Sequence, residues 1–87
     1  MTLADLEPKQ KAIVKAIGDL GELRARLMEL GVLCGEPVQL VRAAPWGDPL
    51  EIRVGDTMIA LRKTDAAKIE VEPISRIRRR RREGVER

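Results

Sequence analysis

Apolar and polar residues alternate along several short segments of this 87-residue chain. The clearest segment is residues 50–54, LEIRV, whose three apolar side chains would share one face of a strand and whose charged side chains would share the other. Gly55 and Asp56 follow as a two-residue turn, and residues 57–61, TMIAL, continue the alternation. The pattern predicts a β-hairpin over residues 50–61.

Three more segments are typical of strands. Residues 11–17, KAIVKAI, are rich in β-forming residues and end at Gly18 and Asp19. Residues 37–44, PVQLVRAA, lead into PWGDP, a cluster of turn-forming residues that would reverse the chain. Residues 68–74, KIEVEPI, would place Ile69 and Val71 on the inward face.

A helical pattern follows the first of these strands. Leucines recur there at spacings of three and four, which predicts one apolar stripe made of Leu20, Leu23, Leu27 and Leu30. Asp19, three residues before Glu22, predicts a capping box, and Gly31 suits the position that ends a helix. A second, one-turn helix is expected to start near Thr64, with the threonine hydroxyl as its cap.

These elements predict a mainly β protein with one or two short helices. Five short strands, with the main helix inserted after the first strand, favour a small five-stranded, partly open β-barrel, because closure removes most exposed strand edges in few residues. The periodicity stops after Ile74, so we expect one domain over residues 1–74 and an Arg-rich, extended tail over residues 75–87.

The amino-acid composition of the chain argues against several classes of function, among them catalysis and metal binding. The chain has no histidine, and its one cysteine, Cys34, has neither a disulfide partner nor an obvious base to activate it. The carboxylates fall on outward faces, where they are more typical of solvated groups than of a catalytic pair, and transition-metal sites favour His and Cys ligands. No phosphate-binding Gly-rich motif is present. We therefore expect no enzyme activity, no metal site and no cofactor.

The sequence shows neither a membrane-spanning segment nor a secretory signal peptide. No apolar stretch approaches the roughly 20 residues that a membrane-spanning helix needs, and the first residues do not form a basic segment followed by an apolar run. A single cysteine agrees with a reducing compartment. The sequence therefore predicts a cytoplasmic protein.

Charge is distributed unevenly along the chain. Residues 75–87 hold seven arginines and two glutamates, a net charge of +5, whereas the chain as a whole is only +3. The residues before Ser75 carry ten basic and twelve acidic side chains and are therefore net acidic. The basic character belongs to the tail, mainly to Arg76, Arg78, Arg79, Arg80, Arg81 and Arg82.

Three interpretations of this tail stay open. It can be a solvated end that aids solubility. It can reach an anionic lipid surface or an acidic patch on a partner, at about 1 kcal/mol per arginine near a charged leaflet. It can also neutralise nucleic-acid phosphates without sequence specificity. A protein specialised for nucleic-acid binding would also have a basic folded surface or aromatic side chains that stack on bases. In this chain the residues before Ser75 are net acidic, and Trp46 is the one aromatic residue of the sequence.

Several motifs together resemble the FeoA family, the small accessory proteins of bacterial ferrous iron transport. They are RLMELG at residues 26–31, Gly35, GDPLEI at residues 47–52 and IALRKTDAAKIEV at residues 59–71, and the resemblance runs from Leu3 to Ile74. Family members commonly have Pro-Gly at two turns where this chain has Pro8-Lys9 and Cys34-Gly35. The Arg-rich tail is a third difference.

The resemblance implies an SH3-like β-barrel whose partner is FeoB, a membrane permease with a cytoplasmic GTP-binding domain. It implies a regulatory or assembly module that docks from the cytoplasm, at the inner face of the membrane. Similar barrels also form the C-terminal domain of metal-dependent transcriptional repressors, but the residues before Lys11 are too few for a helix-turn-helix domain.

Three residues are candidates for partner binding: Trp46, Met28 and Arg62. Trp46 lies at a predicted turn, where tryptophan can anchor an interface or fold back over one end of the barrel. If it is exposed, we expect Trp46 and Met28 to help form an apolar docking patch. Arg62 follows an inward leucine, where the usual structural interpretation is a solvated edge residue that can pair with Asp65.

Overall fold

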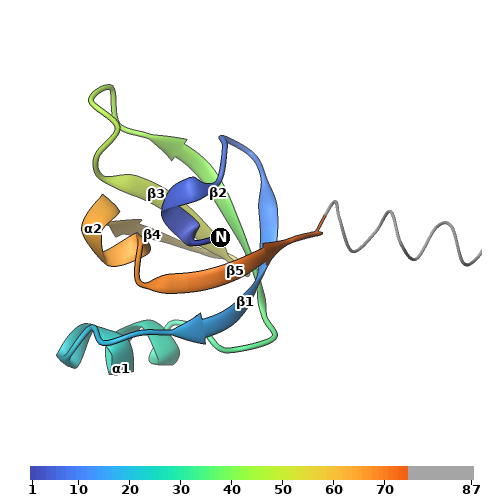
Figure 1. Cartoon of the computed structure of the whole chain (residues 1–87), viewed down its shortest axis with the longest axis vertical. Helices are drawn as coiled ribbons and strands as arrows, with labels where there is room; N and C mark the ends of the chain where they lie inside the picture. The colour runs from blue at the N-terminus through green and yellow to red at the C-terminus, as the bar shows by residue number, and fades with distance from the viewer. Residues whose placement is uncertain (75–87) are drawn as a thin grey trace, which may run out of the picture.

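The structure is a computed structural model that describes residues 1–74, a five-stranded antiparallel sheet with three short helices (Figure 1). The strand order in the sheet is β4-β3-β2-β1-β5. The elements in chain order are the 3₁₀ helix η1 (Leu3–Asp5), β1 (Lys11–Ile17), α1 (Glu22–Glu29), β2 (Pro37–Ala43), β3 (Leu50–Val54), β4 (Thr57–Leu61), α2 (Lys63–Ala66) and β5 (Ile69–Pro73).

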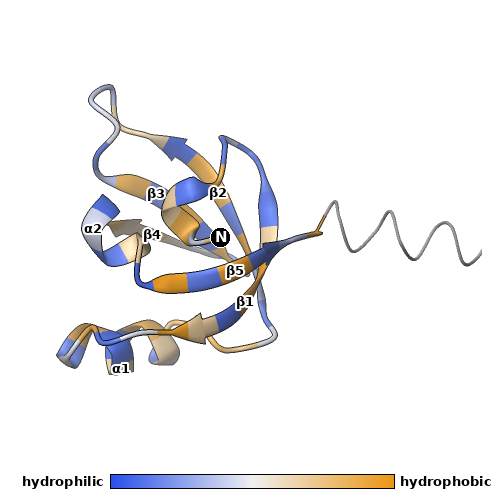
Figure 2. Ribbon diagram, viewed as in Figure 1, coloured by the Kyte–Doolittle hydropathy of each residue, from blue (hydrophilic) through white to orange (hydrophobic). Residues whose placement is uncertain are grey.

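The sheet bends around a wholly aliphatic core. Irregular pairing between Val14 and Ala16 in β1 and between Leu40 and Arg42 in β2 marks the kind of bulge that bends strands and increases their twist. Apolar and polar residues alternate along the strands (Figure 2). The predicted mainly β fold, with five strands and a helix inserted after the first, is confirmed. The proposed tail, residues 75–87, lies outside the described residues.

Helix α1 is shorter than the leucine spacing predicted. Leu27 is its one buried residue, Leu23 packs partly against the core, and Leu20 precedes the helix while packing there too. Leu30 follows the last helical residue and is 40% exposed. The helix nevertheless ends beside Gly31, whose φ of 110° is a conformation that glycine adopts readily.

The predicted capping box of Asp19 and Glu22 is wrong. The residue that precedes the helix is Gly21, with φ 58° and ψ −134°, and no side chain caps the helix there. Because Glu22 is the first helical residue rather than the third, its side chain is not placed to close a box. Glycine at this position lets the chain turn sharply from the end of β1 into α1.

The sequence pattern gave no sign that the N-terminal residues belong to the core. Leu3 and Leu6 are buried, and Thr2 bridges Glu70 while the Val71 amide donates to the Met1 carbonyl at 2.9 Å. The N-terminus therefore covers one edge of β5. The turn into η1 is held by the Thr2 amide, which donates to the Asp5 carboxylate at 2.9 Å and lowers the pKa of Asp5 from its ordinary value.

Lys9 has a φ of 73°, in the left-handed region that favours glycine. It occupies the third position of a turn in which the Gln10 amide donates to the Glu7 carbonyl at 2.9 Å. Pro at the second position and a positive φ at the third are typical of a type II turn. Where family members commonly have Pro-Gly, this chain has Pro8-Lys9. A lysine therefore occupies a position whose backbone conformation suits glycine.

Lys9→Gly is expected to stabilise the domain by roughly 0.5–1 kcal/mol, because glycine relieves the left-handed strain at an exposed residue. The free energy of unfolding from urea titration followed by circular dichroism measures it. Lys9→Ala is the matched control, since it removes the charge but keeps a Cβ, and no such gain is expected. Equal gains in both variants would assign the effect to charge instead.

Candidate protein interaction site

The loop between β2 and β3, residues 44–49, is a braced turn that we call the Trp46 loop. The Gly47 amide donates to the Ala44 carbonyl at 2.7 Å, which places Pro45 and Trp46 at the two central positions of a β-turn. Below this turn, the Ala44 amide donates to the Pro49 carbonyl at 3.0 Å and closes the base of the loop. The sequence predicted this chain reversal from PWGDP, and the hydrogen bonds show how the reversal is fixed.

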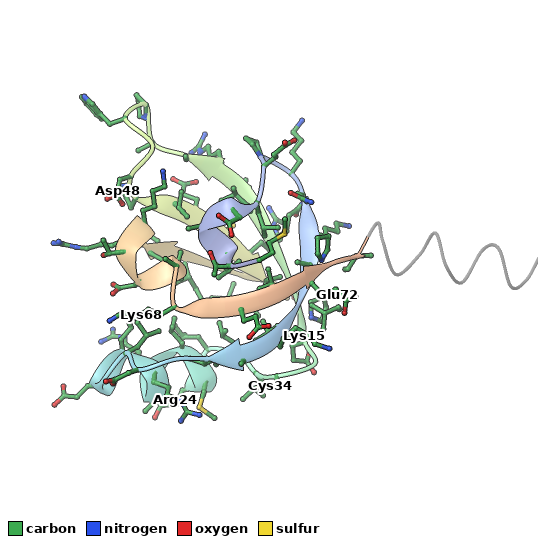
Figure 3. All side chains as sticks on the ribbon, in the orientation of Figure 1. Lys15, Arg24, Cys34, Asp48, Lys68 and Glu72 are labelled. Atoms are coloured by element: carbon green, nitrogen blue, oxygen red, sulfur yellow. The ribbon has the colours of Figure 1, made fainter. Side chains whose placement is uncertain are left out.

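A second brace connects the Trp46 loop to α2. The backbone amide of Lys63, the first residue of α2, donates a hydrogen bond to the Asp48 carboxylate at 2.9 Å. Asp48 lies on the side of the loop that faces this helix (Figure 3). The predicted cap by Thr64 is wrong, because α2 begins one residue earlier and Thr64 lies inside it. An acceptor fifteen residues away in sequence takes the place of a local cap, so α2 and the loop support each other.

Trp46 points into solvent and is 88% exposed. Of the two interpretations that the sequence left open, the structure therefore shows the exposed one, and Trp46 does not cover the end of the barrel. Tryptophan is normally a largely buried residue, and it is strongly enriched among the residues that dominate binding energy. A large, fully presented apolar ring on a doubly braced loop is suited to enter a pocket on another molecule.

Arg62 lies at the same end of the molecule as the Trp46 loop. Asp48, Pro49 and Arg62 line an open surface hollow with a volume of about 360 Å³. Arg62 is exposed and makes no ion pair with Asp65 or any other acid in residues 1–74, so the predicted pairing with Asp65 is wrong. The guanidinium is therefore available beside the tryptophan loop.

Met28 is not brought to this surface. It is half-buried on α1, and α1 lies at the opposite end of the molecule from the β2–β3 loop (Figure 1). The labelled residues Asp48, on the loop, and Arg24, on α1, show the same separation in Figure 3. The structure thus places Arg62 beside Asp48 and Pro49 of the Trp46 loop and leaves Met28 apart. The basic residues 76–82 lie outside the described part of the chain.

Groups that could carry other chemistry are dispersed. Cys34 is an exposed free thiol on the connection from α1 to β2. Within residues 1–74, no three His, Cys, Asp or Glu side chains converge in a way that could hold a metal ion. The same residues include no helix long and apolar enough to cross a membrane.

Asp48→Ala is expected to lower the free energy of unfolding by about 1 kcal/mol, because it removes the acceptor for the first amide of α2. Asp48→Asn is the matched control: it keeps a side-chain oxygen and should lose less. Urea titration followed by far-ultraviolet circular dichroism is the suitable measurement, since Trp46 is exposed in the folded state and reports little on unfolding. Equal stability of wild type and Asp48→Ala would contradict the brace.

A sequence model of the FeoA domain matches residues 1–73. The chain belongs to the FeoA family. The chain is also 39% identical over 75 residues to an Fe(2+) transport protein A/Fe(2+) transporter FeoB fusion protein of Porphyromonas gingivalis. That match covers 86% of this chain and 9% of the fusion protein, so the FeoA chain spans only a small part of that relative.

Solved FeoA structures share the fold. The solution structure of FeoA from Chlorobium tepidum aligns with a TM-score of 0.82 at 31% identity, over 85% of this chain and 70% of that one. The zinc complex of Stenotrophomonas maltophilia FeoA, described as an SH3 domain protein, aligns with a TM-score of 0.74 at 38% identity, over 83% and 89% of the two chains. The expected SH3-like architecture is confirmed.

The barrel also resembles part of a transcriptional repressor. The manganese-activated repressor ScaR aligns with a TM-score of 0.69 at 22% identity, over 83% of this chain but 34% of the repressor. Identity at this level shows a common fold and nothing about regulation of transcription.

Proposed function

We propose that this FeoA-family chain is a non-enzymatic accessory protein of ferrous iron transport that docks on the cytoplasmic, GTP-binding part of a FeoB permease. In this proposal the protein works in the cytoplasm, next to the inner face of the membrane. It contributes an interaction surface and no chemistry of its own. The expected absence of a cofactor is part of the same proposal.

The fusion relative supports the pairing with FeoB. In Porphyromonas gingivalis a sequence similar to 86% of this chain is part of one polypeptide with a FeoB transporter. A covalent connection keeps two domains at a high effective concentration, which favours even a weak contact between them. A separate FeoA chain has no such connection, so it needs a surface with enough affinity of its own.

The 88% exposure of Trp46 is the observation that carries the choice of surface. Anchor residues that enter a partner pocket are most often Trp, Tyr or Arg, and the Trp46 loop presents one of these with Arg62 nearby. The two braces of the loop lower the entropy lost on binding, because the backbone is already ordered. A role of Met28 in binding FeoB would require a second contact, because Met28 lies at the opposite end of the molecule from the Trp46 loop.

The basic tail is assigned a supporting role in the proposal. Residues Arg76, Arg78, Arg79, Arg80, Arg81 and Arg82 would attract the protein to anionic headgroups around the permease. The first 74 residues are net acidic, so this attraction would depend on the tail alone. Non-specific nucleic-acid binding through the same arginines is the competing function, and it would show steep salt dependence on duplex DNA.

Isothermal titration calorimetry of the full chain and of residues 1–74 against the isolated cytoplasmic domain of a cognate FeoB, at low and high salt, tests this function. Binding by both chains supports docking through the barrel. No binding by either chain refutes it. Binding only by the full chain, with equal affinity for duplex DNA, would assign the function to the arginines instead.

A further inference from the structure

Strand β4 presents an unpaired edge. It is the last strand of the sheet and, within residues 1–74, it pairs only with β3. The other end strand, β5, is partly covered by the N-terminal residues through the Thr2–Glu70 bridge. Met58 of β4 is 47% exposed and Ala60 is exposed as well, so both side chains on the outer face of β4 are accessible.

The hairpin register identifies the backbone groups on this edge. Val54 faces Thr57 across the two-residue turn, and residues that flank such a turn form a hydrogen-bonded pair. Antiparallel pairs alternate, so Ile59 also bonds toward β3, whereas Met58 and Ala60 direct their amide and carbonyl groups away from it. The edge thus offers two donors and two acceptors to another strand.

Nothing in the β4 sequence protects this edge against pairing. Natural edge strands are usually blunted by lysine, proline or an inward charge, and TMIAL at residues 57–61 contains none of these. Charges occur only just beyond its two ends, with Asp56 before the strand and Arg62 after it. Neither of these makes an ion pair in residues 1–74.

We propose that β4 pairs with β4 of a second copy of this chain, antiparallel and centred on Ile59. In this register Met58 of one copy lies opposite Ala60 of the other, so all outward amides and carbonyls of the two residues are matched by the two-fold symmetry. The same register places Asp56 opposite Arg62 at both ends of the contact. The dimer gains four backbone hydrogen bonds and two opposite-charge pairs.

The charges at the two ends of β4 favour pairing of β4 with β4 of a second copy. They do not favour an array in which β4 of each copy pairs with β5 of the next. Opposite charges at the two ends of β4 are complementary to the same strand turned around. The N-terminal residues partly cover the edge of β5, which disfavours a head-to-tail array and favours closure as a dimer. A contact between two five-residue strands is much smaller than the roughly 1,600 Å² of a standard interface, so the dimer should form at high protein concentration.

This inference does not rest on the proposed docking to FeoB, because it needs no partner other than the chain itself. The full chain, analysed by sedimentation velocity over a wide concentration range, should shift from monomer to dimer. Asp56→Lys and Arg62→Glu each introduce two like-charge pairs by symmetry and should weaken dimerisation by roughly tenfold or more. The double variant Asp56→Lys/Arg62→Glu restores opposite charges and should regain the dimer.

Ala60→Lys is a second, independent test, because it places a charge on the edge and should abolish dimerisation. Circular dichroism verifies that each variant folds, and amide chemical shifts of Met58 and Ala60 on dilution report the contact directly in the wild-type chain. The proposal is overturned by a wild-type chain that stays monomeric throughout, by a double variant that fails to recover, or by dimerisation that survives Ala60→Lys.

Discussion

The Trp46→Ala variant is expected to bind the cytoplasmic domain of FeoB at least about 30-fold more weakly than the wild-type chain, since truncation of a tryptophan anchor costs about 2 kcal/mol or more. The side chain is 88% exposed and contributes little to the core, so the fold should be retained. Calorimetric titration gives the affinity, and the urea midpoint should match that of the wild type. The predicted effect is therefore on binding alone.

Met28→Ala is the matched comparison, because Met28 is another apolar candidate at the opposite end of the molecule. It should leave the affinity nearly unchanged if the Trp46 loop is the docking surface. Full affinity in Trp46→Ala together with a loss in Met28→Ala would move the docking surface to α1. Arg62→Lys keeps the charge but not the planar guanidinium, so a loss of affinity there would indicate a bidentate contact of Arg62 with FeoB beside the Trp46 loop.

Leu27→Ala should have the largest effect on stability. Leu27 is 1% exposed and is the one residue of α1 that is fully buried. Removing it deletes buried methyl groups and leaves a cavity, which costs about 2–5 kcal/mol. In a domain of this size, that loss lowers Tm by roughly 10–30 °C. Thermal unfolding followed by circular dichroism is the measurement.

Leu30→Ala provides the control on the same segment. Leu30 is 40% exposed, and its replacement should change the free energy of unfolding by less than about 1 kcal/mol. Similar losses for both leucines would show that the whole predicted stripe packs against the barrel. A small loss for Leu27 would show that α1 contributes little to the stability of the core.

The strands could be predicted from the sequence because each depends on neighbouring residues. Alternation in LEIRV and TMIAL, together with the two-residue turn between them, predicted β3, β4 and their pairing. The start of β1 and of β2 was predicted at Lys11 and at Pro37, as observed. Burial on one face imposes a period of two that needs no information from distant parts of the chain.

The starts of the two α-helices and the packing of the N-terminus could not be predicted in the same way. Asp19 and Thr64 have the right residue types for caps, but the backbone places Gly21 and Arg62 at those positions. Leu3 and Leu6 form no periodic pattern, so their burial became visible only when the N-terminal residues were seen against β5. Local propensity competes with contacts made by distant residues, and those contacts prevailed at each of these places.

The sequence by itself determined the strand segments, the aliphatic composition of the core and the uneven distribution of charge, because composition and short-range periodicity carry that information. The family was indicated separately, by the resemblance of several motifs in their order and spacing. Only the tertiary structure decided that Trp46 is exposed, that Asp48 caps a helix fifteen residues away and that Arg62 lies beside Asp48 and Pro49 of the Trp46 loop. It also decided that β4 has no second partner strand within residues 1–74. Each of these features depends on which segments, distant in sequence, lie next to each other. The order of the strands in the sheet determines those neighbours.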